Sequence, residues 1–331
     1  MRTANFKSAA IAALLSMGLL TGCTNGITNQ KTSNHMDTLN LTQEWDKKFP
    51  QSNKVNHRKV TFKNRYGITL AADLYEPKNI ESKVPAIAVS GPFGAVKEQS
   101  SGLYAQTMAE CGFLTLAFDP SYTGESGGEP RNVASPDINT EDFSAAVDFL
   151  IAHPNVDAKR IGIIGICGFG GMGLNAAAMD TRIKATVAST MYDMSRVNAN
   201  GYFDAEDSAE VRRNKREAMN AIRTRDAQNG TATPGTPGLP TSIKGDEPQF
   251  VKDYFDYYKT ERAFHARAIN SNGAWNPTMA LSFINMPLLT YIHEIDNAVL
   301  LIHGENAHSR YFSEDAFKRL KGCLLYTSPS P

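Results

Sequence analysis

The chain has 331 residues, and its 34 Lys and Arg residues balance 34 Asp and Glu residues, which leaves a formal net charge of zero at pH 7. This balance gives no electrostatic support for binding to nucleic acid or to an anionic surface. The length is ample for a sizeable hydrophobic core, and α/β folds of this size often form one domain.

The first 22 residues predict an export signal. Arg2 and Lys7 supply a basic start, and the apolar segment from Ala9 to Leu20 is short for a bilayer span. The next residues, L-T-G-C, end at Cys23 and look like a bacterial lipobox, in which this cysteine becomes the lipidated first residue of the mature protein. We therefore expect an exported protein, lipid-anchored to the bacterial cell envelope and facing the periplasm or the surface. An ordinary secretory signal with an incidental cysteine is the alternative.

Residues 23–56 are rich in Asn, Gln, Ser and Thr, and they predict a polar tether with one short helix around Trp45. Residues 57–193 then alternate between strand-like and helix-like patterns, which indicates a mostly parallel sheet with helices on both faces. The expected elements are a hairpin over 59–75, strands over 85–90, 113–118, 161–166 and 183–189, and helices over 99–110, 142–153 and 172–179.

Residues 194–290 interrupt this alternation and predict a helical insertion. It contains a charged helix over 209–226, a Pro-, Gly- and Thr-rich linker over 231–248, and then a helix with an aromatic face. The residues on that face are Phe250, Val251, Tyr254, Phe255 and Tyr258. We expect the segment as a whole to cap an active site, although for any single aromatic residue packing against the sheet domain is favoured over lining a pocket. The core resumes over 291–322, with a strand at 298–303.

Cys167 is the most informative residue, because a β-branched run ends at it and glycines surround the turn that follows. The stretch 160–171 reads R-I-G-I-I-G-I-C-G-F-G-G, which predicts a strand, a sharp turn and a helix with a nucleophile at the turn. Small neighbours are needed there because such a nucleophile elbow holds its backbone in a strained conformation.

Two other interpretations of this turn stay open. Gly168, Gly170 and Gly173 spell G-x-G-x-x-G with Asp193 twenty residues beyond, which is the pattern of a dinucleotide-binding loop in an oxidoreductase. That loop normally belongs to the first strand-turn-helix unit, whereas about a hundred residues of strand-like and helix-like sequence come first here. The other interpretation is a purely structural glycine turn.

From about residue 60 to residue 320 the chain resembles the α/β-hydrolase superfamily, closest to its dienelactone-hydrolase-like and Xaa-Pro-dipeptidyl-peptidase-like members. Besides the elbow, the matching segments are D-P-S-Y-T-G-E-S-G-G-E-P-R at 119–131, H-P-N-V-D at 153–157 and L-L-I-H-G-E-N at 300–306. The resemblance implies the α/β-hydrolase fold, a mostly parallel doubly wound sheet with a helical cap insertion. The dienelactone-hydrolase branch is similar in using cysteine where most relatives use serine. Phe169 departs from the usual small residue, and we expect it to reshape the turn or to wall off one side of the pocket.

The resemblance also implies the chemistry of the site. Cys167 would attack an ester, lactone or small amide and form a covalent acyl-enzyme that water then hydrolyses. The oxyanion hole would use the backbone N–H of Gly168 and one N–H from the G-P-F-G loop at 91–94. Phe93 is the expected second donor and Gly94 the next choice, because proline at position 92 has no N–H.

The acid is expected in the turn after the strand over 298–303. Relatives carry Asp at a position that Ala307 occupies here, and Glu305 is the nearest substitute. Glu314 and Asp315 lie in a predicted helix and are poorer choices. His308 shares this turn, and we interpret it as a loop histidine in preference to a catalytic one.

The histidine base is missing from this chain, because in this fold it follows the last strand in chain order. Residues 323–331 read C-L-L-Y-T-S-P-S-P, which looks like the translation of a sequencing adapter; a natural Ser- and Pro-rich tail is the alternative. We therefore expect the native chain to supply the base beyond residue 322, and the chain as written to be inactive or severely impaired. The other histidines are poor choices because they lie in the tether, in the insertion or at the ends of helices and strands; they are His35, His57, His153, His265, His293 and His303.

The remaining expectations concern partners. Cys111 is expected to pack as a small hydrophobe. No H-E-x-x-H, paired-cysteine or clustered His and Asp motif is present, so we expect no metal and no cofactor. The expected partner is a small-molecule ester, lactone or amide, with membrane contact only through the lipid anchor and no nucleic acid. Because the acid is ambiguous and the base is missing, a non-catalytic ligand-binding lipoprotein on the same scaffold is the alternative.

Overall fold

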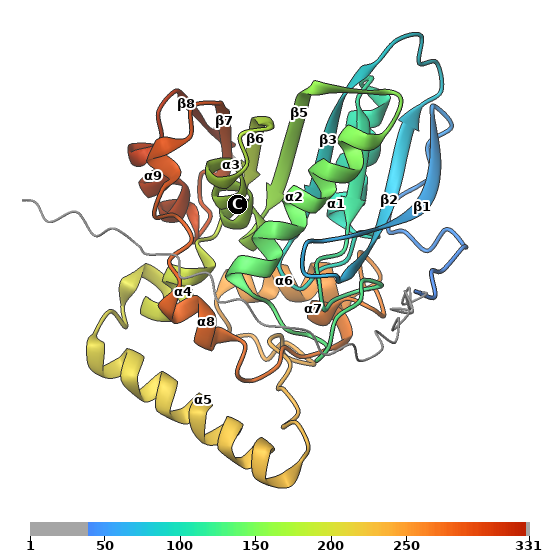
Figure 1. Cartoon of the computed structure of the whole chain (residues 1–331). Coiled ribbons are helices and arrows are strands. Elements are labelled where there is room, and N and C mark those ends of the chain that lie inside the picture. The colour runs from blue at the N-terminus through green and yellow to red at the C-terminus, as the bar shows by residue number, and fades with distance from the viewer. Residues whose placement is uncertain (1–38, 329–331) are drawn as a thin grey trace, which may run out of the picture. The chain divides into compact units, whose positions relative to one another are not determined.

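The computed structural model describes residues 39–328, so the expected signal peptide and Cys23 lie outside the described residues. Within this range eight strands form one sheet in the order β1-β2-β4-β3-β5-β6-β7-β8 (Figure 1). The strands are β1 (Val55–Lys63), β2 (Thr69–Pro77), β3 (Val84–Ser90), β4 (Leu114–Phe118), β5 (Val156–Ile166), β6 (Ile183–Ser189), β7 (Ala298–Gly304) and β8 (Cys323–Ser328). Only β1 with β2 and β2 with β4 pair antiparallel, which confirms the expected mostly parallel sheet.

Helices cover both faces of the sheet because its strands are apolar on both sides. In β3, Ala86 and Ala88 join one hydrophobic cluster, whereas Ile87 and Val89 join the other. Helix α1 (Ser100–Glu110) packs against the second cluster. The first cluster is covered by α2 (Pro136–Ala152), α3 (Gly168–Met179) and α9 (Arg310–Arg319). This two-sided cover leaves the loops at the carboxyl ends of the parallel strands free to form a site.

The segment before β1 packs on the sheet domain from residue 39 onward. The short helix expected around Trp45 is wrong, because residues 39–54 contain no helix. The Trp45 indole instead donates a hydrogen bond to the carbonyl of Phe49 at 2.9 Å, and its ring lies 5.7 Å from the Phe49 ring and 5.1 Å from the His57 ring. Phe49 is buried. The end of the predicted tether therefore contributes to the core.

The insertion is helical as expected, and it contains more helices than the sequence predicted. The charged helix is α5 (Ala209–Asn229), which stands away from the sheet in Figure 1 and buries only Met219. The aromatic helix is α6 (Gln249–Lys259). Four short elements were missed, since two turns or fewer carry little periodicity. They are α4 (Met194–Asn200), η1 (Tyr202–Asp204), α7 (Ile269–Asn272) and α8 (Ala280–Asn285), and η2 (Ile292–Glu294) follows in the resumed core.

Residues 323–328, part of the stretch that reads like a sequencing adapter, form β8 at the edge of the sheet. β8 pairs parallel with β7, from Cys323 beside Val299 to Ser328 beside Gly304. Tyr326 and Thr327 are residue types that favour strands, which accounts for this pairing. Across residues 39–328 none of the helices combines the length and the apolar character that a membrane crossing requires.

Candidate active site

Cys167 lies at the sharp turn between β5 and α3. Its backbone has φ 56° and ψ −125°, a conformation that residues other than glycine seldom adopt. The glycines around it are required by close contacts. A Cβ at Gly165 would lie 2.1 Å from the Phe169 carbonyl oxygen, and one at Gly168 would lie 2.9 Å from the Phe93 Cβ. This is the strand-turn-helix geometry that the sequence predicted.

Phe169 points into the core beneath the turn. It is 2% exposed, its ring centroid lies 6.3 Å from that of Phe143, and it is absent from the lining of the cavity described below. The expectation that Phe169 walls off the pocket is therefore wrong, because its side chain leaves the turn on the side of α2.

Two backbone N–H groups face the Cys167 sulfur. Burial raises the pKa of the Cys167 thiol, and hydrogen bonds from the backbone of Gly168 and of Phe93 act in the opposite direction. These are the two donors predicted for the oxyanion hole, and the structure brings both to the nucleophile. They come from the first turn of α3 and from the loop after β3, so two neighbouring parallel strands supply them.

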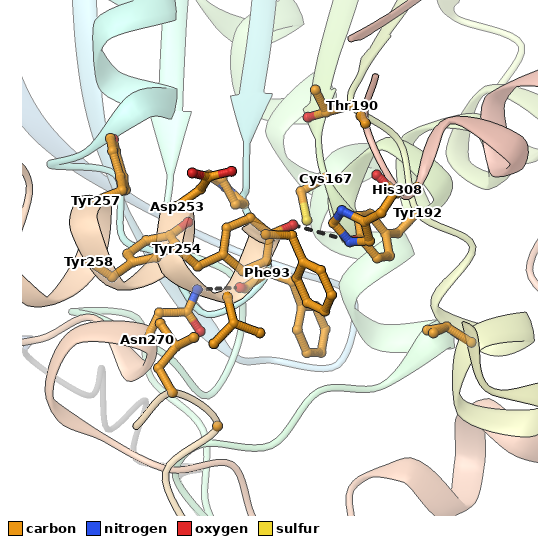
Figure 2. A pocket seen from close by; sticks show the side chains of 18 of the residues that line it. Phe93, Cys167, Thr190, Tyr192, Asp253, Tyr254, Tyr257, Tyr258, Asn270 and His308 are labelled. Atoms are coloured by element: carbon orange, nitrogen blue, oxygen red, sulfur yellow. Dashed lines mark hydrogen bonds between the residues drawn. The ribbon is translucent and has the colours of Figure 1, made fainter. Parts of the chain in front are cut away.

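A cavity of about 820 Å³ opens above Cys167 (Figure 2). One part of its wall comes from loops at the carboxyl ends of the sheet strands, namely Pro92, Phe93, Thr190, Tyr192 and residues 306–309. The other part comes from the insertion, and its aromatic members are Tyr202, Phe250, Tyr254, Tyr257, Tyr258 and Trp275. The aromatic face of α6 therefore lines a cavity, with the exception of Phe255. The insertion therefore supplies one wall of the cavity.

Tyr192 and His308 form a hydrogen-bonded group in the wall of this cavity. The Tyr192 hydroxyl lies 2.5 Å from His308 Nε2 and 3.1 Å from the Tyr254 hydroxyl. The His308 ring stacks on Phe250 with centroids 4.0 Å apart, and burial lowers the pKa of His308. Burial, aided by the nearby Cys167 sulfur, raises the pKa of Tyr192 and Tyr254, so both hydroxyls stay protonated at neutral pH.

His308 is thus a half-buried residue of the cavity, and sequence reasoning undervalued it. The available signal was its place in the loop after β7, because such loops meet at one edge of a parallel sheet.

His303, at the end of β7, is a structural residue. Its two ring nitrogens contact Ser313 Oγ at 2.7 Å and Ser309 Oγ at 3.0 Å, and burial lowers its pKa to about 4.

The predicted acids are not brought to Cys167. Glu305 is exposed and lies outside the cavity lining, whereas Ala307 belongs to it. Asp315 pairs with Arg196 at 2.9 Å, and Glu314 pairs with Arg310 at 2.7 Å. Among the described residues, none of these carboxylates forms a hydrogen bond with a histidine.

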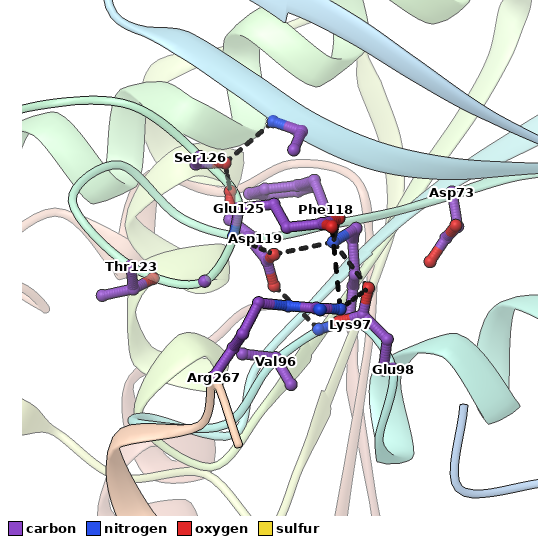
Figure 3. A network of polar contacts seen from close by, with 12 residues as sticks. Asp73, Val96, Lys97, Glu98, Phe118, Asp119, Thr123, Glu125, Ser126 and Arg267 are labelled. Atoms are coloured by element: carbon purple, nitrogen blue, oxygen red, sulfur yellow. Dashed lines mark hydrogen bonds and ion pairs between the residues drawn. The ribbon is translucent and has the colours of Figure 1, made fainter. Parts of the chain in front are cut away.

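An ion cluster occupies the neighbouring loops (Figure 3). It comprises Lys59, Lys97, Glu98, Asp119, Glu125 and Arg267. Lys97 Nζ lies 2.7 Å from Glu98, 2.8 Å from Asp119 and 2.7 Å from Glu125, and its side chain is fully buried. Burial opposes ionisation of Glu125, yet attraction to Lys97 and hydrogen bonds from Lys59 and Lys97 lower its pKa to about 2. Sequence reasoning missed this cluster.

Two further findings concern cysteines and metals. Cys111 is exposed, so its expected packing is wrong; it caps α1 immediately before a surface turn at Gly112. Cys111 and Cys167 are free thiols. In the described range, no three His, Cys, Asp or Glu side chains gather in a way that could hold a metal ion.

Comparisons with known proteins agree with this architecture. Residues 66–321 match the model of the X-Pro dipeptidyl-peptidase (S15) family. The uncharacterized protein PA2218 of Pseudomonas aeruginosa is 60% identical over 323 residues, which cover 96% of this chain and 86% of that protein. Its crystal structure matches with a TM-score of 0.85 and 62% identity over 88% of this chain and 92% of that one.

Two fungal proteins are more distant. The thiohydrolase aneE of Aspergillus aculeatus is 33% identical over 132 residues, which cover 40% of this chain and 41% of that protein. The α/β hydrolase GrgF of a Penicillium species shares the fold, with a TM-score of 0.67 at 20% identity over 83% of this chain and 91% of that one. The fold is therefore that of the α/β hydrolases, and the chain belongs to the X-Pro dipeptidyl-peptidase (S15) family.

Proposed function

We propose that this protein hydrolyses a carboxylic ester, a lactone or a small amide through Cys167 and a covalent acyl-enzyme. The observation that carries the proposal is the geometry at the turn, where a cysteine with φ 56° faces two backbone N–H donors at the floor of an aromatic cavity. The partial similarity to a protein named thiohydrolase favours adding thioesters to the substrate list.

The reaction would proceed in two steps. Cys167 Sγ gives up its proton to a base and bonds to the carbonyl carbon, while the carbonyl electron pair moves onto the oxygen near the N–H groups of Gly168 and Phe93. Collapse of this adduct expels the alcohol, thiol or amine, which takes up the proton. Water, deprotonated by the same base, then attacks the acyl carbon; the acid leaves and the thiol is restored.

We propose that the base is a histidine that the native chain carries beyond residue 322. Because burial raises the pKa of the Cys167 thiol, the thiol is protonated at neutral pH unless a base accepts its proton. Reading the genomic sequence downstream of residue 321 tests this. A strand-like run followed by a loop histidine within about 40 residues supports the proposal, because a strand and its loop need no more length than this. A stop codon directly after the present tail contradicts it.

The test of the hydrolase uses the native-length protein and a thiol-reactive acyl probe. Because the exposed Cys111 thiol also reacts, the labelled residue is identified by mass spectrometry of peptides. We expect the adduct on the Cys167 peptide in the wild type and in Cys111→Ala, and loss of that adduct in Cys167→Ala. Release of acid from a panel of esters, lactones, amides and thioesters then identifies the bond that is cleaved. If Cys167 stays unmodified while a nicotinamide cofactor binds, the oxidoreductase interpretation replaces this one.

The second candidate is a non-catalytic ligand-binding protein. The exposed position of Glu305, away from the cavity, favours it, since the carboxylate predicted to orient a base does not lie at the site. Retention of aromatic esters by the native-length protein, with no acid released and no acyl-enzyme formed, would support this candidate.

We also propose that the protein is exported and anchored through Cys23. The lipobox-like L-T-G-C supports this proposal. The proposed partner is a small-molecule substrate and not a nucleic acid, since the formal net charge is zero. Mass spectrometry of the membrane fraction is expected to find lipid on Cys23. Cys23→Ser is expected to move the protein out of that fraction, and an unchanged distribution would contradict the anchor.

A further inference from the structure

We propose that Asn270, a residue of the insertion, is a positioning residue that holds the loop at 91–94 and thereby aims the Phe93 N–H at the reacting carbonyl. The proposal rests on the proposed function, because it concerns the same oxyanion hole. It assigns the insertion a part in arranging the catalytic backbone in addition to covering the cavity.

Two hydrogen bonds connect Asn270 to consecutive peptide groups of the loop. Its side-chain Nδ2 donates to the Phe93 carbonyl oxygen at 2.8 Å, a contact drawn in Figure 2. Its backbone N–H donates to the Gly94 carbonyl oxygen at 3.0 Å. Two bonds from one residue fix both the position and the orientation of this segment, because a single bond would leave it free to rotate.

The fit around Gly94 is tight. Gly94 has φ +82°, and a Cβ built on it would lie 2.4 Å from Asn270 Oδ1. The Asn270 amide therefore rests directly on the backbone of the loop. The Phe93 side chain is held as well, since its ring stacks on Trp275 with centroids 4.3 Å apart. Both groups that fix Phe93 from this side belong to the insertion.

The contact matters for catalysis because Phe93 supplies one of the two N–H groups that face Cys167. Its N–H and its carbonyl belong to the two peptide groups that flank one Cα, so fixing the carbonyl and the ring limits where the N–H can point. A donor in an oxyanion hole loses its value when its direction shifts, because the site works by preorganisation.

The test compares two variants of α7 in the native-length protein. Asn270→Ala removes the side-chain donor, and Asn272→Ala is the control, because Asn272 is exposed on the same short helix. We expect Asn270→Ala to lower kcat by about 10- to 100-fold with little change in KM, since loss of a whole oxyanion donor costs about 100- to 1,000-fold. Asn272→Ala is expected to stay within about twofold of the wild type.

A second measurement does not depend on turnover. The rate of Cys167 alkylation as a function of pH reports the thiol pKa, which the Phe93 hydrogen bond lowers. We expect the midpoint to move to higher pH in Asn270→Ala and to stay unchanged in Asn272→Ala. If the alkylation midpoint of Asn270→Ala moves to higher pH but the wild type hydrolyses none of the substrates, the positioning role of Asn270 is retained and the proposed function is rejected.

The isosteric Asn270→Asp keeps the backbone bond and replaces the side-chain donor with an acceptor. We expect it to behave like Asn270→Ala, and it serves as the test if the alanine variant does not fold. The proposal is overturned if Asn270→Ala and Asn270→Asp both show the wild-type alkylation midpoint and a kcat within twofold of wild type.

Discussion

The carboxyl edge of the sheet has two halves that differ in chemistry. The loops after β3 and β4 carry the ion cluster, in which Lys97, Glu98 and Asp119 have fully buried side chains. The loops after β5, β6 and β7 carry Cys167, Tyr192 and His308 around an open cavity lined by aromatic rings. One half is closed and charged, and the other is open and mainly aromatic, with Asp253 and Arg262 as charged members of its lining.

The difference indicates a division of labour. Buried charges that satisfy one another fix loop geometry, because separating them from their partners costs much more than the pairing contributes. The hydroxyl and backbone N–H groups of the open half are neutral and face a cavity. They are therefore available to form hydrogen bonds with a substrate. The halves meet in the loop after β3, because its Phe93 lines the cavity whereas its Lys97 and Glu98 belong to the ion cluster. The insertion contacts both parts of this loop, through Asn270 at Phe93 and through Arg267 at Glu98.

The largest expected effect is the loss of activity in Cys167→Ala, a change in the open half that should leave the stability of the fold nearly unaltered. On the proposed function, we expect Cys167→Ala to lower kcat/KM by about 1,000-fold or more, because the nucleophile is lost. Its free energy of unfolding is expected to stay within about 1 kcal/mol of the wild type, since little buried surface changes. Ester hydrolysis and urea unfolding measure the two quantities, and Cys111→Ala is the control. Activity that persists in Cys167→Ala would remove the catalytic role from this half of the edge.

The closed half is expected to show the opposite pattern. Lys97→Met leaves three carboxylates without their shared cation, and loss of one partner from a buried ionic group costs about 3–5 kcal/mol. Lys318→Met is the matched control, because Lys318 is exposed and pairs only at the surface; no measurable change in the free energy of unfolding is expected. Urea unfolding measures both. If Lys97→Met cost no more than its control, the cluster would not be a stabilising element.

The features that could be predicted from the sequence are those formed by residues that are consecutive in the chain or that match a known family pattern. The elbow was found because strand, turn and helix are consecutive around Cys167, and the sheet because its strands and helices alternate along the chain. Both donors at the sulfur were found through resemblance to a family. These features need only neighbouring residues or a known pattern.

The other contacts join residues that are far apart in the chain. Asn270 and Phe93 are separated by 177 positions, and Tyr192 and His308 by 116. Lys97 was overlooked because a lone lysine before a helix is an ordinary surface residue until Asp119 and Glu125 are folded over it. His308 was undervalued for the same reason, since only the parallel order of β5, β6 and β7 brings its loop to Cys167.

Acid is expected to weaken the closed half through Glu125. Glu125 has a pKa of about 2 in the folded protein and an ordinary value of 4.5, so below pH 4.5 the unfolded chain takes up a proton that the folded chain does not. The stability from this group is complete above pH 4.5 and is lost as the pH falls towards 2. Urea unfolding between pH 6 and pH 3 measures the loss, and Glu125→Gln is expected to flatten its pH dependence. An equally steep dependence in Glu125→Gln would assign the acid sensitivity to other titratable groups, among them the buried His303 and the half-buried His308.

The smallest expected effect concerns the wall of the open half. Tyr192→Phe removes the hydroxyl that contacts His308 and Tyr254, and we expect a loss of about 1 kcal/mol in urea unfolding. The loss is small because the freed groups border a cavity that water can enter, whereas carboxylates freed in the ion cluster are sealed from water. Tyr291→Phe, at an exposed position, is the control and is expected to change nothing. If Tyr192→Phe lowers the free energy of unfolding by about 3 kcal/mol or more, hydrogen bonds in the cavity wall stabilise the fold as strongly as the buried charges do. The two halves would then differ in their exposure to water and not in their contribution to stability.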